Sequence, residues 1–259
     1  MNRIKKSFFM KVLLATFVFV GVILVPAVNQ AGSRQIGGYV DQAEDRFVRN
    51  VWNFIKNFQS SQSVGSHSWK YDQYYWAEPF EFGSSHQYYV DRMDLSYAAG
   101  HGNKYYLQTN QSAGEGFDFR DAPPYGDLKN SGDMEFLIIE SCYTVGSYPE
   151  DPSDWWTPYN DMFQGLHQFV GFRTLSVSDN GIPNNYADRL RNNQGVWQAW
   201  FDAVDDERWW IFNPTLDDGA AFPGYASVIC YTSTDGDRIG SYAADPAGGT
   251  SGMYTYWQY

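Results

Sequence analysis

The fold is decided by the stretch EFLIIESC, residues 135–142. Its centre, from Phe136 to Ile139, is an unbroken apolar run, which is typical of a strand buried on both faces of a parallel sheet. Ser141 and Cys142 follow where that strand is expected to end. Because ligands and catalytic groups gather at the carboxyl ends of parallel strands, Cys142 stands where a functional residue is expected.

Around this stretch, strand and helix patterns alternate along the chain. Apolar, strand-type runs predict further strands over residues 93–99, 169–174 and 225–232. Helical spacing predicts helices over residues 42–58, 159–168 and 195–204. This alternation predicts an α/β fold with a mainly parallel central sheet.

Other signals are local. Asp41 is expected to cap the first helix, with Glu44 completing a capping box. Residues 59–87 are expected to form loops with one short strand, and residues 108–133 a long loop. The Gly-, Asp- and Tyr-rich tail after Asp235 is expected to be irregular.

A polar triplet, Gly100-His101-Gly102, follows the strand predicted over 93–99. If that strand lies parallel to and beside the 135–140 strand, His101 and Cys142 emerge at one edge as a base and a nucleophile. The attacking species is the thiolate, and an imidazole titrates near neutrality and can take or return a proton. The N–H groups of Gly102 and Cys142 would stabilise an oxyanion, at roughly 3 kcal/mol per donor.

His-Gly after one strand and the acidic-small-Cys triplet Glu140-Ser141-Cys142 after the next resemble the caspase-like cysteine peptidases, the group of caspases, legumain, clostripain and gingipains. The resemblance covers residues 93–174. More narrowly, the chain resembles a bacterial branch of that group. It implies a caspase–haemoglobinase-like three-layer sandwich, with His101 as proton-transfer residue, Cys142 as nucleophile and the Gly102 backbone in the oxyanion hole. Glu140 is expected to help form the substrate site.

The sequence departs from that family in two places. Residues 103–132 lack the helical pattern normally expected between the His and Cys strands. Ser141 stands where Ala or Gly is more usual. No local motif marks a specificity pocket, so the family's substrate preference is not carried over.

The first 27 residues have the layout of a secretory signal peptide. An uncharged apolar run of about 14 residues, Val12–Val25, is short for a bilayer span of about 20, and Val25-Pro26-Ala27 offers a cleavage site. Residues 28–259 are then expected to be one domain, secreted and free of the membrane; an uncleaved anchor is the alternative. This run is preceded by the basic residues Arg3, Lys5, Lys6 and Lys11.

The net charge of the chain narrows the range of expected binding partners. Removing those four basic residues takes the formal net charge from -12 to -16. A chain this acidic repels nucleic acid and anionic membrane surfaces, so neither is an expected partner. The oligomeric state stays open.

Cys142 also has competing interpretations. A secreted chain with two cysteines favours a disulfide between Cys142 and Cys230. A zinc site from His86, His101 and Cys142 is a weaker alternative, because neither HExxH nor CxxC spacing is present. His67, His86 and His167 are otherwise expected to be structural.

Calcium held by acidic residues of the C-terminal half competes with solvated acidic turns, because their spacing does not fit an EF-hand loop. These acidic residues are Asp217, Asp218, Asp235, Asp237 and Asp245. No GxGxxG or GxxxxGK[ST] motif supports a nucleotide cofactor, and no GxSxG supports a serine hydrolase. The sequence therefore predicts neither a metal nor a cofactor.

Two functions remain. The first is a secreted cysteine endopeptidase that acts on protein or peptide substrates through His101 and Cys142. The second is an inactive domain of the same fold that binds a protein or glycan through aromatic-rich loops. The chain has 10 Trp, 20 Tyr and 18 Phe, and most of these are expected in the core.

Overall fold

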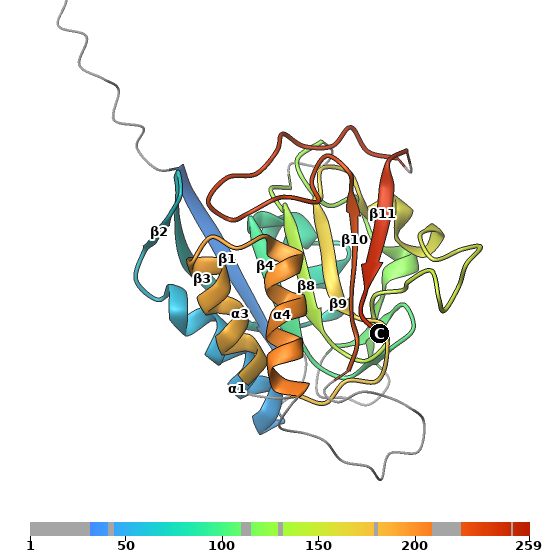
Figure 1. Ribbon diagram of the computed structural model, residues 1–259, viewed down its shortest axis with the longest axis horizontal. Coiled ribbons are helices and arrows are strands. Elements are labelled where there is room, and N and C mark those ends of the chain that lie inside the picture. Colours follow the sequence, from blue (N-terminus) through green and yellow to red (C-terminus); the bar gives the residue numbers. More distant parts are fainter. Residues whose placement is uncertain are drawn as a thin grey trace, which may run out of the picture. The chain divides into compact units, whose positions relative to one another are not determined.

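The computed structural model describes residues 32–40, 44–109, 115–128, 132–178, 181–208, 224–249 and 251–259. Their main element is an eight-stranded sheet in the order β11-β10-β9-β8-β4-β1-β3-β2 (Figure 1). Pairing is parallel from β3 through β1, β4 and β8 to β9, and antiparallel at both margins. The predicted α/β fold with a mainly parallel sheet is therefore confirmed. The strands are β1 (Gly32–Val40), β2 (Gln62–Val64), β3 (His67–Trp76), β4 (Leu95–Ala99), β8 (Phe136–Glu140), β9 (Gln168–Phe172), β10 (Ala226–Tyr231) and β11 (Met253–Trp257).

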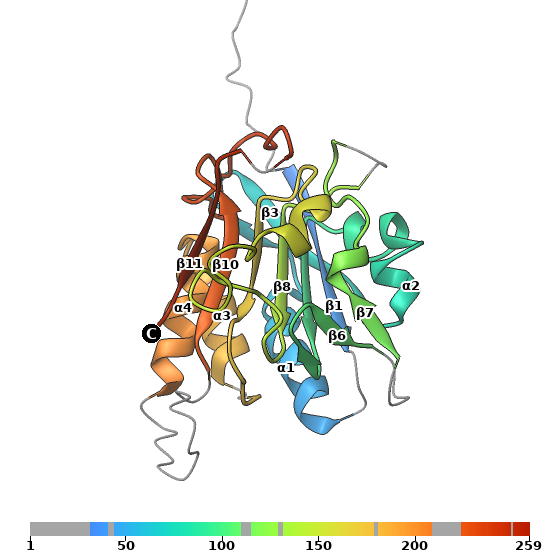
Figure 2. The same cartoon turned by 90° about the vertical axis from the view of Figure 1, so that its right-hand side faces the viewer.

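Helices and a smaller sheet cover the two faces of the large sheet, which gives three layers (Figure 2). One face carries α1 (Asp45–Ile55), α3 (Gly181–Arg191) and α4 (Val196–Arg208). The other carries α2 (Pro79–Phe82) and a three-stranded sheet of β5 (Gly102–Asn103), β6 (Tyr106–Gln108) and β7 (Gly116–Asp118). The 3-10 segments are η1 (Lys56–Phe58), η2 (His86–Tyr88), η3 (Val90–Arg92), η4 (Phe119–Asp121) and η5 (Thr157–Met162).

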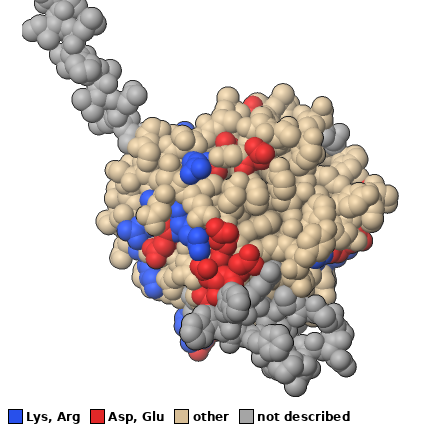
Figure 3. Space-filling model, viewed as in Figure 1, with Lys and Arg blue, Asp and Glu red and all other residues tan. Residues whose placement is uncertain are grey.

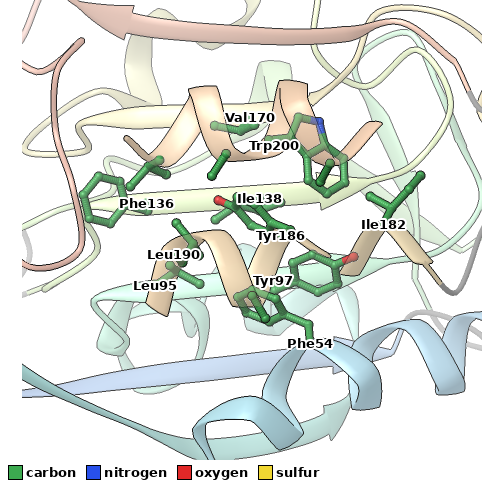
Figure 4. Packing of buried hydrophobic residues seen from close by; sticks show 14 of the residues in the cluster. Phe54, Leu95, Tyr97, Phe136, Ile138, Val170, Ile182, Tyr186, Leu190 and Trp200 are labelled. Carbon is green, nitrogen blue, oxygen red and sulfur yellow. The ribbon is translucent and has the colours of Figure 1, made fainter. Parts of the chain in front are cut away.

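The core beneath the three longer helices is built from aromatic rings (Figure 4). Phe54 of α1 stacks on Tyr97 of β4, with ring centroids 4.4 Å apart, and on Tyr186 of α3. Trp200 of α4 packs edge-on against Tyr97 and Tyr186. All four side chains are fully buried. These rings have the core role that was expected of most of the aromatic residues.

Strand β1 was not predicted, because its glycines interrupt the apolar pattern. Gly38 is required by packing: a Cβ there would lie 2.8 Å from Val51 Cγ1 and 2.9 Å from Ile55 Cγ2 of α1. The glycine therefore lets α1 lie directly on the sheet.

Residues 59–87 were expected to form loops with one short strand, but they contain β2 and the ten-residue strand β3. Only Trp69 and Gln73 of β3 are buried, because the strand lies next to the short edge strand β2. Its exposed tyrosines and polar residues therefore hid the strand pattern.

Other elements also differ from the predictions. The loop predicted over 108–133 contains β7 and η4, and the tail predicted to be irregular contains β11. The helix predicted over 159–168 is the 3-10 segment η5, and α3 was not predicted. As expected, the described part of residues 103–132 contains no α-helix.

The predicted signal peptide, residues 1–27, lies outside the described residues, as does the predicted cap Asp41. Within the residues that are described, no helix has both the length and the apolar character that a membrane crossing requires.

Negative charge gathers locally on the face that carries the longer helices (Figure 3). Asp202, Asp205 and Asp206 are exposed toward the end of α4. Arg189 of α3 pairs with Asp202 and Asp206 at N–O distances of 3.3 and 2.6 Å. Being exposed, these pairs are expected to add little stability.

Candidate active site

The two predicted motifs leave the sheet side by side. Strands β4 and β8 are parallel neighbours with Ala99 opposite Glu140, and the Gly100 N–H donates to the Glu140 carbonyl at 3.3 Å. The segments that carry His101 and Cys142 therefore emerge at one carboxyl edge, which lies at the bottom of the sheet in Figure 1. The expected arrangement of these two strands is confirmed.

A cleft of about 260 Å³ opens at this edge. Both His101 and Cys142 line it, and the His101 side chain is 44% exposed. Among the described residues, no hydrogen bond joins the imidazole to the thiol, so each is held by other groups. The cleft is lined by Arg46, Phe47, Gly100, His101, Glu140, Cys142, Leu175, Ser176 and Ser178.

The Cys142 sulfur is held by the segment that follows β9. The Ser176 N–H donates to Cys142 Sγ at 3.3 Å, and the Ser176 hydroxyl lies 3.6 Å from it. Tyr143 adopts a left-handed φ of 54° and its N–H donates to the Thr174 carbonyl at 2.9 Å. This turn ties the chain after Cys142 to the same segment and fixes the thiol at the cleft.

His101 is held by residues at the start of α1. Its Nε2 lies 2.9 Å from Glu44 Oε1 and 3.0 Å from Arg46 Nη2, and its ring packs edge-on against Phe47. Glu44 is the residue before the helix, but its side chain makes no capping hydrogen bond. In the predicted capping box Glu44 was the third residue of the helix, whereas it lies directly before α1 and its carboxylate is directed to His101.

The charges around His101 determine which ring nitrogen can act as a base. Partial burial favours a higher pKa for Glu44, but the hydrogen bond from His101 and the charge of Arg46 outweigh it and lower that pKa. A carboxylate only accepts hydrogen bonds and a guanidinium only donates them, so Nε2 satisfies one of them at a time. An Nε2–H donating to Glu44 leaves Nδ1 with the lone pair that a base requires.

Gly102 occupies a position that tolerates no side chain. A Cβ there would lie 2.6 Å from the Tyr106 carbonyl oxygen and would also collide with the Ser141 hydroxyl. In the β5–β6 pairing, the Gln108 N–H donates to the His101 carbonyl at 2.9 Å, and Gly102 is opposite Leu107. Antiparallel pairs alternate, so Gly102 falls in the non-hydrogen-bonded pair and its N–H points away from β6.

Glu140 lies beneath the cleft and is only 2% exposed. Its carboxylate accepts hydrogen bonds from Asn50 of α1 and from the hydroxyl of Tyr97 on β4. These contacts connect the end of β8 to the helix that carries Arg46. Substrate binding by Glu140 stays a prediction, and its observed contacts are structural.

The disulfide interpretation is wrong, because both cysteines are free thiols. Cys230 is opposite Gln168 of β9, and Gln168 is opposite Phe136, so Cys230 lies level with the beginning of β8. Cys142 lies six residues further along, or about 20 Å. A disulfide requires Cα atoms within about 7 Å. Burial, with Asp235 and Asp237 nearby, raises the pKa of Cys230 to about 12.

The zinc alternative is also wrong, because His86 is at the other end of the sheet. It is buried before β4, where its Nδ1 lies 2.8 Å from Asp91 Oδ2. His167 is fully buried between Asp237 and Asp245, at 2.6 and 3.3 Å, which is the structural role expected of it.

The described acidic residues of the calcium alternative are bonded to other side chains. Asp237 and Asp245 face His167, and Asp235 accepts a hydrogen bond from the Tyr256 hydroxyl at 3.2 Å. Asp217 and Asp218 lie outside the described residues.

The chain matches one protein family over most of its length. Residues 35–257 match the family described as "Domain of unknown function (DUF6345)". A search of curated proteins finds no match.

Two solved structures are similar to the chain. One is a secreted C11 cysteine protease from Bacteroides thetaiotaomicron in complex with an irreversible peptide inhibitor, at 13% identity and a TM-score of 0.45, covering 77% of this chain and 66% of that one. The other is an inactive zymogen C11 protease from Parabacteroides distasonis, at 9% identity and a TM-score of 0.39, covering 76% and 61%. The chain thus spans less than two thirds of the length of either protein.

Proposed function

The chain belongs to the DUF6345 family, and we propose that it is a secreted cysteine endopeptidase. Cys142 is the nucleophile and His101 the proton-transfer residue. One observation carries the proposal: the thiol and the imidazole leave neighbouring parallel strands and line the same cleft of about 260 Å³. A nucleophile and a base in one open cleft are the minimum for acyl transfer.

In the proposed reaction, His101 takes the proton of the Cys142 thiol, and the thiolate attacks the carbonyl carbon of a peptide bond and forms a tetrahedral oxyanion. The bond to nitrogen then breaks, and His101 gives that proton to the departing amine. Water, deprotonated by His101, attacks the thioester, and the departing thiolate takes the proton back from His101, which releases the acid and the free thiol. His101 therefore acts as base and then as acid in each half of the reaction.

Two backbone groups support the oxyanion. The Gly102 N–H is free of the β5–β6 pairing, so it can donate to a substrate carbonyl oxygen. The Cys142 N–H is the second expected donor, at roughly 3 kcal/mol of transition-state stabilisation for each.

Alkylation of the thiols tests the nucleophile directly. Iodoacetamide at neutral pH is expected to modify Cys142 and to stop digestion of a mixed peptide library. Cys230 is fully buried with a raised pKa, so it serves as an internal control that stays unmodified in the folded protein. Mass spectrometry of tryptic peptides measures both sites. Complete modification of Cys142 with full peptidase activity would contradict the proposal.

Glu44 is proposed as the residue that positions His101. Glu44→Gln removes the charge from the acceptor beside Nε2, so kcat is expected to fall roughly 10- to 100-fold with little change in KM. Glu44→Asp should restore part of kcat, because a carboxylate returns at a shorter reach. Steady-state kinetics on one peptide substrate measure kcat and KM separately.

Asp45→Asn is the matched control, since Asp45 is the exposed neighbouring residue and stays outside the cleft lining. It removes the same charge from the same turn and should leave kcat unchanged. Equal losses in the Glu44 and Asp45 variants would assign the effect to the helix start and not to His101.

A second candidate function rests on an aromatic groove at the edge of the large sheet. Tyr256 of β11 stacks on Trp197 of α4 at 4.7 Å, and Tyr259 is 78% exposed. Such a surface suits a protein or glycan partner. Glycan-array binding that survives Cys142→Ala, in a protein whose thiol resists iodoacetamide, would favour this function. The groove of about 400 Å³ is lined by Trp197, Phe201, Thr255, Tyr256, Trp257 and Tyr259.

A further inference from the structure

One polar side chain of helix α1 is buried beside the cleft. Asn50 is 0% exposed, although asparagine is one of the poorer residues for the interior of a helix. Val51 and Phe54, which are buried on the same helix, are apolar, as the core side of a helix normally is. Burying an amide costs free energy unless its hydrogen bonds are made. The hydrogen bonds of Asn50 are therefore what distinguishes this position from the rest of the core.

The amide of Asn50 donates to two segments that form the cleft. Its Nδ2 donates to Glu140 Oε1 at the end of β8 and to Ser178 Oγ, 2.7 Å away, in the segment after β9. An amide nitrogen carries two hydrogens, enough for one bond to each segment. The Glu140 carboxylate also accepts from the hydroxyl of Tyr97, and an ionised carboxylate has no hydrogen to give, so the amide must present its nitrogen to Glu140.

Each partner of Asn50 lies two residues from a group that fixes the thiol. Glu140 comes two residues before Cys142. Ser178 comes two residues after Ser176, whose N–H donates to the Cys142 sulfur at 3.3 Å. Two residues of extended chain span at most about 7 Å, so both connections from Asn50 to the sulfur are short.

The imidazole is held by the same helix. Arg46 Nη2 lies 3.0 Å from His101 Nε2, and the Phe47 ring packs edge-on against the imidazole. Arg46 precedes Asn50 by four residues and Phe47 precedes it by three, so the three side chains share one face of α1. Both members of the proposed dyad are therefore attached to one rigid element, while the described residues show no hydrogen bond between them.

We infer that Asn50 is a positioning residue that sets the distance between Cys142 and His101. The inference rests on the proposed peptidase function. Asn50 stays outside the cleft lining, so it acts through Glu140 and Ser178 and not on the substrate. A displacement of about 1 Å in the reacting groups can cost roughly 100-fold in rate. Loss of the Asn50 hydrogen bonds should therefore slow the chemical step more than it weakens substrate binding.

Steady-state kinetics of Asn50→Ala, Ser178→Ala and the double variant test this role. Asn50→Ala should lower kcat roughly 10- to 100-fold and change KM by less than about threefold. Ser178→Ala removes one of the two bonds and should lower kcat by a smaller factor. In the Asn50→Ala background the Ser178 substitution should have no further effect, because the bond that it removes is already absent.

Val51→Ala is the matched control. Val51 is the next residue of α1, is fully buried and packs on Gly38 of β1. Its truncation should lower stability through lost packing and leave kcat unchanged below the unfolding temperature. Equal losses of kcat in Asn50→Ala and Val51→Ala would assign the effect to a general loosening of the helix and would overturn the inference.

Hydrogen exchange tests the same attachment without reference to activity. The amides of residues 173–178 should exchange roughly threefold faster or more in Asn50→Ala and in Ser178→Ala than in the wild type, because the segment loses a hydrogen bond to α1. Val51→Ala should not accelerate exchange in this segment. Mass spectrometry of peptic peptides measures the rates.

The outcomes separate this inference from the proposed function. A wild type that cleaves no peptide would contradict the proposed function, whereas faster exchange of residues 173–178 in both variants would still support the attachment of the Cys142 segment to α1. If the wild type cleaves peptides but the two substitutions lower kcat independently, so that their factors multiply in the double variant, Asn50 does not position the nucleophile through Ser178. Unchanged exchange in Asn50→Ala would overturn the attachment as well.

Discussion

Cys142→Ala is expected to lower kcat/KM for peptide cleavage by at least about 1,000-fold while the protein stays folded. The loss is this large because the thiol forms the covalent intermediate, and no other described side chain in the cleft can replace it as a strong nucleophile. The described contacts of the sulfur are with one residue, Ser176, so the free energy of unfolding should change by about 1 kcal/mol or less. Rates on a peptide library and a urea titration measure the two effects separately.

Cys230→Ala is the matched control. It removes the other thiol of the chain from a fully buried position in β10, so it should cost about 1 kcal/mol of stability through lost packing and leave kcat/KM unchanged. Cleavage that persists in Cys142→Ala and is lost in Cys230→Ala would refute the assignment of the nucleophile.

Trp200→Ala is expected to give a large loss of stability, about 3–5 kcal/mol. The Trp200 ring is fully buried among Tyr97, Phe172 and Tyr186, and its Nε1–H donates to the Gly171 carbonyl at 3.0 Å. Its removal leaves a cavity between α4 and the sheet and takes away one hydrogen bond. The midpoint and slope of urea unfolding give the change in free energy.

Trp52→Ala provides the comparison. Trp52 lies on α1, is 40% exposed, and its ring forms T-shaped contacts with Tyr71 and Tyr74. Its removal should cost less than about 1 kcal/mol. Similar losses for Trp200 and Trp52 would mean that the aromatic cluster beneath the helices contributes no more than a surface contact does.

The strands that carry the site could be predicted because they are buried on both faces. Strand β8 is fully buried and consists mostly of a continuous apolar run, and β4 is followed by Gly100, which marks the turn to His101. The neighbouring strands β1 and β3 could not be predicted. Glycine in β1 serves close packing of α1, and β3 exposes most of its residues, so neither shows an apolar pattern.

The candidate site was predictable in part for a similar reason. His101 and Cys142 follow strands whose register could be inferred, so their shared edge was foreseeable. Glu44 was missed because its position before a helix has a sufficient local explanation as part of a capping box. Ser176 was missed because its contact with Cys142 depends on the path of the segment after β9. Contacts made by loops across the sheet edge leave no periodic trace in the sequence.

The position of β1 also governs the order of assembly. This strand comes first among the described elements, yet it pairs on both sides, with β3 and with β4. During synthesis one of its edges stays open until Trp76 has left the ribosome and the other until Ala99 has, and pairing then joins segments dozens of residues apart. Such non-local parallel pairing is slow and leaves strand edges exposed to aggregation. The sheet is therefore expected to form late and cooperatively, beginning with its central strands.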